Sequence, residues 1–134
     1  MEVWYEYAGQ KPTEEFYQAV EYGIHALCLE EVPGELTIEW VSGYSDSLGD
    51  CMFDGIDEYH IRLTSYDIGT LFHELTHVMQ YSNYELEVYK EGHGYWQGKM
   101  HEGLTYDESP WEVEAYHMEQ VLLRCFEVHR QKSS

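Results

Sequence analysis

The stretch His73-Glu74-Leu75-Thr76-His77 decides which fold and which kind of site this chain forms. On a helix, residues four apart lie on one face, so the two imidazoles are close enough to bind one metal ion. The glutamate beside the first histidine is then placed to accept a proton from a water that the metal activates. These five residues therefore predict a metal-binding helix.

The residues around this stretch also favour a helix. Ser65 and Asp67 are of types that begin helices, and the predicted helix extends from about residue 67 to 81. Its apolar residues recur at helical spacing, at Ile68, Leu71, Phe72, Leu75, Val78 and Met79. The alternative is an ordinary amphipathic helix with two half-buried histidines. This alternative gives no reason for the glutamate between the histidines, Glu74, or for a second motif further along the chain.

Capping residues and alternation predict the other regular elements. A helix begins at Thr13 and ends near residue 30, before Pro33-Gly34. Alternating apolar residues predict strands at 35–41 and 58–63. A last helix begins at Ser109-Pro110 and ends near residue 130. Its apolar side is predicted to consist of Val113, Tyr116, Val121, Leu122, Cys125 and Phe126.

The order of these elements predicts an α+β fold in one domain covering residues 1–134. The expected sheet is small and mainly antiparallel, and packs on the N-terminal helix, the histidine helix and the C-terminal helix. Its strand at 59–63 is expected to form the edge beside the cleft. Residues 42–55 are predicted to be a loop or hairpin. Residues 82–108 are predicted to be a long loop with one short strand near 86–89.

The strongly acidic composition limits the partners that the chain can have. With 26 acidic and 7 basic residues the net charge is −19, which repels nucleic acids and anionic membranes. The expected partner is a protein or peptide substrate. The alternative is an acidic decoy that mimics DNA and occupies a DNA-binding protein, in which the metal helix is only structural. Such a decoy would keep its activity without Glu74.

The cysteines and the N-terminus predict a cytoplasmic protein. Cys28, Cys51 and Cys125 are odd in number and widely spaced, which indicates reduced thiols and not a disulfide framework. The N-terminal residues lack the basic and apolar regions of a signal peptide, and no run of 18 apolar residues occurs.

A catalytic metal site needs a third protein ligand, and the start of the last helix is the best place for it. Glu112 shares a helical face with the small residue Ala115, where another helix can approach closely. Glu114 lies about 200 degrees round the helix from Glu112, so the two cannot face one ion. Glu114, His93 and His101 are the alternatives. Glu112 also has capping-box spacing from Ser109, in which case it would cap its own helix.

Three motifs together resemble small phage and bacterial gluzincin-type zinc metallopeptidases. They are His-Glu-Leu-Thr-His-Val-Met-Gln at 73–80, Tyr-Trp-x-Gly-Lys at 95–99 and Pro-Trp-Glu-Val-Glu-Ala at 110–115. The resemblance covers about residues 58–120. The chain departs from many members of that group at Tyr116, where they have an acidic or amide residue.

The resemblance implies a zincin-like fold and a zinc metalloendopeptidase. His73, His77 and Glu112 would bind Zn²⁺, and Glu74 would act as the general base in peptide-bond hydrolysis. A donor that stabilises the negative charge of the transition state is also expected. The candidates for it are Tyr95, His101, Tyr106 and His117.

Overall fold

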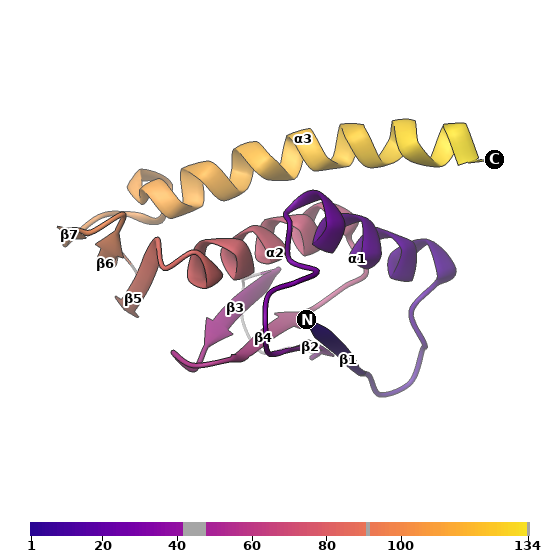
Figure 1. Cartoon of the computed structure of the whole chain (residues 1–134), viewed down its shortest axis with the longest axis horizontal. Helices are drawn as coiled ribbons and strands as arrows, with labels where there is room; N and C mark the ends of the chain where they lie inside the picture. Colours follow the sequence, from indigo (N-terminus) through magenta and orange to yellow (C-terminus); the bar gives the residue numbers. More distant parts are fainter. Residues whose placement is uncertain (42–47, 91, 134) are drawn as a thin grey trace.

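The computed structural model describes residues 1–41, 48–90 and 92–133. In Figure 1 the larger sheet lies at the bottom, α1 and α2 cover it, and α3 lies across the top. The described residues thus form the predicted α+β fold, with three helices and two small sheets. The elements in chain order are β1 (Glu2–Glu6), α1 (Glu14–Ala26), β2 (Glu35–Trp40), β3 (Gly49–Phe53), β4 (Glu58–Leu63), α2 (Ile68–Ser82), β5 (Leu86–Lys90), β6 (His93–Trp96), β7 (Lys99–His101), the short 3-10 helix η1 (Tyr106–Glu108) and α3 (Pro110–Ser133).

The larger sheet is mixed, so the prediction of a mainly antiparallel sheet is wrong. Its strand order is β1-β2-β4-β3; β1 and β2 are parallel, β2 and β4 are parallel, and β3 is antiparallel to β4. The sequence pattern does not mark β1, because this five-residue strand turns only Val3 and Tyr5 away from solvent. Helix α1 is the crossover that makes β1 and β2 parallel.

In the described part of the chain the edge strands of this sheet are β1 and β3, with β3 beside α2, and the prediction that residues 59–63 form an edge is wrong. Strand β4 is paired on both sides, with β2 and β3, and its side chains alternate between buried and half-buried positions. Strand β3 lies within the stretch predicted as loop or hairpin, whose residues 42–47 are outside the described part of the chain. Among the described residues, β3 ends the sheet beside α2.

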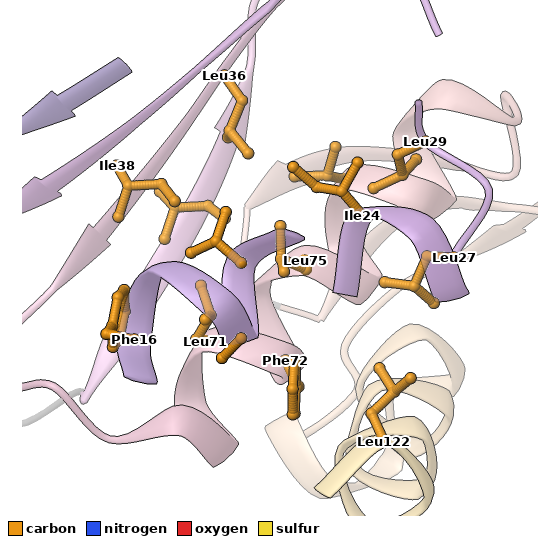
Figure 2. Close-up of a cluster of buried hydrophobic side chains, with 14 of the residues drawn as sticks. Phe16, Ile24, Leu27, Leu29, Leu36, Ile38, Leu71, Phe72, Leu75 and Leu122 are labelled. Carbon is orange, nitrogen blue, oxygen red and sulfur yellow. The ribbon is translucent and has the colours of Figure 1, made fainter. Parts of the chain in front are cut away.

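The core lies between the sheet and the helices. In Figure 2, Leu36 and Ile38 of β2 point toward Phe16 of α1 and Leu75 of α2. These four side chains are at most 1% exposed, and Leu122 of α3 closes the core on the far side of α2. Burying such apolar side chains is the main driving force that holds α2 in place.

Helix α1 ends at Ala26, earlier than the predicted end near residue 30. The N–H of Leu27 donates to the carbonyl of Gly23, and Cys28 then adopts a φ of 58°, a left-handed conformation that ends the helix. The thiol of Cys28 is exposed. It is free, as are Cys51 and Cys125, which agrees with the sequence prediction.

Helix α3 begins where predicted, but Leu122 and Phe126 are the only residues of its predicted apolar side that are buried. The buried residues are Trp111, Ala115, Leu122 and Phe126, whereas Val113, Tyr116, Val121 and Cys125 are exposed. The predicted apolar side mixed two faces, because Val113 and Leu122, both assigned to it, lie about 180 degrees apart on a helix. Neither α3 nor any other described helix is long and apolar enough to cross a membrane.

Residues 82–108 are more regular than predicted. Strands β5, β6 and β7 form a three-stranded antiparallel sheet, and η1 follows it directly before α3. Figure 1 shows this small sheet at the N-terminal end of α3. The three strands are only three to five residues long, too short for periodicity to predict all of them.

Candidate metal centre

Helix α2 presents the two histidines on its buried side. Asp67 caps the helix, and its carboxylate accepts hydrogen bonds from the backbone N–H of Thr70 at 2.9 Å and from the Thr70 hydroxyl at 2.7 Å. One and two turns further on, His73 and His77 are 4% and 7% exposed. Both imidazoles therefore lie on the same side of α2, as the spacing of four predicts.

Helix α3 brings Glu112 to the two histidines. The Oε1 atom of Glu112 lies 2.9 Å from Nε2 of His73 and 3.0 Å from Nε2 of His77. In the described part of the chain, these three residues form the one group whose ligand atoms lie close enough together, within 4.8 Å, to hold a metal ion. Glu112, and not Glu114, is thus the carboxylate that the structure brings to the two histidines.

The hydrogen bonds of the two Nδ1 atoms determine which ring nitrogen of each histidine presents a lone pair to Glu112. Nδ1 of His73 lies 3.2 Å from Oε1 of Glu119, and Nδ1 of His77 lies 2.8 Å from Oε1 of Gln80. A carboxylate or amide oxygen can only accept, so each Nδ1 carries the hydrogen. In the neutral rings each Nε2 then presents a lone pair toward Glu112.

Two lone pairs and a carboxylate facing one another need a positive charge between them. A proton can supply this charge, because burial alone lowers the pKa of His77, but Glu112 and Glu74 outweigh burial and raise that pKa above its ordinary value. Burial likewise favours the neutral form of Glu112, yet the two histidines beside it lower its pKa to about 2. Two nitrogen donors and one oxygen donor are a set that suits Zn²⁺.

Glu74 is buried beside this group. Its side chain is 5% exposed, and burial raises its pKa to about 7, against the opposing effect of His77 and His73. A carboxyl group with a pKa near neutrality exchanges a proton easily at physiological pH.

Two cavities flank the group, and Glu74 lines both. The one on the His77 side, about 240 Å³ in volume, is bounded by β3, Leu86, Val88 and Trp111. The one on the His73 side, about 460 Å³ in volume, is bounded by Asp67, Tyr116 and Glu119 among others. Tyr106 of η1 also lines both cavities. Gly49 of β3 lines both cavities too, so both lie at this edge of the sheet.

Four residues were predicted as donors that stabilise the negative charge of the transition state. Of these four, Tyr106 is the one that lies beside the His73, His77 and Glu112 group. Its hydroxyl is 3.3 Å from Nε2 of His73, and burial raises its pKa, so the hydroxyl stays protonated at neutral pH. Tyr95 and His117 are exposed, and neither they nor His101 line the two cavities. His93, an alternative ligand, instead lies 3.9 Å from Glu102.

Sequence reasoning missed Gln80 and Glu119, which hold the two rings. Glu119 lies seven residues after Glu112, two turns along the same face of α3, and this spacing is a signal that was available. Ser109 does not form the alternative capping box, because its hydroxyl donates to the carbonyl of Thr105 and the carboxylate of Glu112 lies at the histidines.

The metal-free protein is expected to lose stability as the pH rises from 5.5 to 7.5. In this range folded Glu74, with its pKa of about 7, still binds a proton that the unfolded chain, with a value near 4.5, has released. The raised pKa of His77 acts in the same direction above 6.5. The contribution of Glu74 is on the order of 2 kcal/mol. Urea unfolding at the two pH values measures it.

The control for this pH prediction is Glu74→Gln, which removes the titrating group and should show a clearly flatter pH dependence. If the wild type and Glu74→Gln depend on pH alike, Glu74 is not the buried acid described above.

No protein-family model, curated protein or solved structure that was compared with the chain matches it. The buried His73, His77 and Glu112 group on α2 and α3 is itself consistent with a zincin-like site.

Proposed function

We propose that this protein is a zinc-dependent metallopeptidase in which His73, His77 and Glu112 hold the ion. The observation that carries the proposal is the convergence of two Nε2 atoms and one carboxylate oxygen from two helices, with Glu74 buried beside them. When bound, zinc supplies a Lewis acid that acidifies a water molecule and polarises a carbonyl oxygen.

Glu74 has the burial and the pKa that a general base needs. As a carboxylate it accepts a proton from the attacking water, and as a carboxylic acid it returns this proton to the leaving amine. A pKa of about 7 lets one group do both near neutral pH. Glu74 follows His73 directly, about 100 degrees round the helix, so it lies beside the ligands without being one of them.

The edge strand β3 supports a peptide as the substrate. Gly49, Asp50 and Cys51 of this strand line the cavity that also contains Glu74 and His77. An extended peptide that binds beside β3 would lie along the cavity that these two residues line. Pairing through backbone hydrogen bonds is independent of peptide sequence, which fits a protein or peptide substrate.

Tyr106 fits the role of the hydrogen-bond donor to the oxyanion of the transition state. We expect Tyr106→Phe to lower kcat roughly tenfold, because the tyrosine shares this task with the ion, and to change zinc affinity little. Steady-state kinetics on one peptide and a zinc titration measure the two effects. Tyr95→Phe is the matched control, because that tyrosine is exposed on β6. A Tyr106→Phe protein with unchanged kcat would exclude the role.

A substrate-trapping screen tests the proposed function. Tagged Glu74→Gln protein, which should bind substrates without cleaving them, is used to capture proteins, and the captured proteins are then offered to the wild type. The wild type should cleave a captured protein, and Glu112→Ala should not. If the wild type cleaves none of the proteins that Glu74→Gln retains, the trapped proteins are not substrates and the peptidase proposal loses its support.

A further inference from the structure

The side chain of Gln80 makes three hydrogen bonds in the space between α2 and α3. It is completely buried and lies three residues after His77 on α2. Its Oε1 atom is 2.8 Å from Nδ1 of His77. Its Nε2 atom is 3.0 Å from the backbone carbonyl oxygen of Trp111 and 3.1 Å from Oε1 of Glu114. One amide thus connects a histidine of α2 to two points on α3.

The partners on α3 leave this amide only one orientation. The carbonyl of Trp111 and the carboxylate of Glu114 can only accept hydrogen bonds, so both must face the NH₂ group of Gln80. The amide oxygen therefore faces His77, and Nδ1 of His77 must donate to it. With Nδ1 protonated, Nε2 is the ring nitrogen that presents a lone pair toward Glu112.

The hydrogen bonds of Gln80 also fix the position of Glu112 relative to His77. Trp111 directly precedes Glu112, so the bond from Gln80 to the carbonyl of Trp111 holds the backbone beside Glu112 against the helix that carries His77. Trp111 itself is 3% exposed, and α3 packs against α2.

We propose that Gln80 and Glu114 form a clamp that fixes His77 in its Nδ1–H form and holds Glu112 in register with it. Gln80 is a positioning residue, and Glu114 acts through Gln80. The role of this clamp in metal binding rests on the proposed zinc site. The hydrogen bonds of the clamp join protein groups alone, so they can be tested without metal.

The chemistry of the clamp requires an amide at position 80. A carboxylate at this position would also accept a hydrogen bond from Nδ1 of His77. It could not donate to the carbonyl of Trp111 or to the carboxylate of Glu114, however, because it has no N–H. An aliphatic side chain would satisfy none of the three partners. Removing such an outer partner of a metal-binding histidine weakens metal affinity by about 10- to 100-fold in other sites.

The first test is zinc affinity, measured by competition with a chromophoric chelator. Gln80→Met keeps the size of the side chain and removes all three bonds, and Glu114→Leu removes one anchor from a half-buried position. We expect zinc affinity to fall about 10- to 100-fold in Gln80→Met and by a smaller factor in Glu114→Leu. Glu114→Gln still offers an oxygen to Gln80 and should restore nearly the wild-type affinity.

Gln120→Met is the matched control for this titration. It makes the same substitution at an exposed position of α3 and should leave zinc affinity unchanged. If Gln80→Met proves too unstable to measure, the comparison of Glu114→Leu with Glu114→Gln tests the clamp by itself.

The second test observes the His77 ring directly, in metal-free protein with ¹⁵N-labelled histidine. The Nδ1–H proton should exchange slowly in the wild type and in Glu114→Gln. In Gln80→Met it should be lost to rapid exchange with water. A persistent signal in Gln80→Met, or unchanged zinc affinity in both Gln80→Met and Glu114→Leu, would overturn the proposal. A wild type that shows the slow proton but binds no zinc would contradict the proposed function and not the hydrogen bonds of the clamp.

Discussion

Glu112→Ala is expected to weaken zinc binding by about a hundredfold or more. Structural zinc sites with four ligands bind with about 10–16 kcal/mol, so the loss of one of three protein ligands should cost several kcal/mol. Among the described residues, Glu112 is the one carboxylate within 3.0 Å of both Nε2 atoms, and it is the candidate ligand that comes from α3. Titration with zinc in the presence of a competing chelator measures the loss.

Glu114→Gln is the matched control for Glu112→Ala. It changes the neighbouring carboxylate on the same turn of α3, whose Oε1 lies 3.1 Å from Gln80 and not at the histidines. Its zinc affinity should stay near that of the wild type. If Glu114→Gln loses the metal and Glu112→Ala retains it, the third ligand has been assigned two residues too early.

Glu74→Gln is expected to lower the rate of peptide hydrolysis by about 10² to 10⁴ while zinc content stays the same. The substitution keeps the size of the side chain and removes the group that accepts the proton. The metal-free mutant should be no less stable than the wild type at neutral pH, because it removes a buried ionisable group. Zinc stoichiometry and cleavage rates on the same peptides measure both effects. Wild-type rates in Glu74→Gln would exclude it as the base.

Local sequence signals predicted the bounds of α2 well, and they selected the three residues that the structure brings together as candidate ligands. The cap at Asp67 and the apolar stripe place the helix within one residue of its observed bounds. His73 and His77 follow from a spacing of four, and Glu112 follows from the register of a helix whose start at Pro110 is clear. Each of these predictions depends on residues within one or two turns of one another, which is the range over which helical periodicity acts.

The parts that were missed depend on contacts between distant segments. Gln80 reaches Trp111 and Glu114 across two packed helices, and nothing within α2 predicts which residue of α3 it meets. The mixed sheet was missed for the same reason, because the parallel pairing of β1 with β2 joins residues more than thirty positions apart. Tyr106 reaches His73 from η1, whose position is set by the packing of the whole stretch after β7.

The most direct test of the proposed peptidase activity is peptide hydrolysis by wild-type protein whose metal has been removed by a chelator and then returned in steps. We expect the stripped protein to cleave no peptide. Hydrolysis should recover in proportion to added zinc until one ion per chain is bound. Glu112→Ala should not recover at the same zinc concentrations. Hydrolysis that persists in the stripped protein, or a wild type fully loaded with zinc that cleaves nothing in a broad peptide library, would contradict the account.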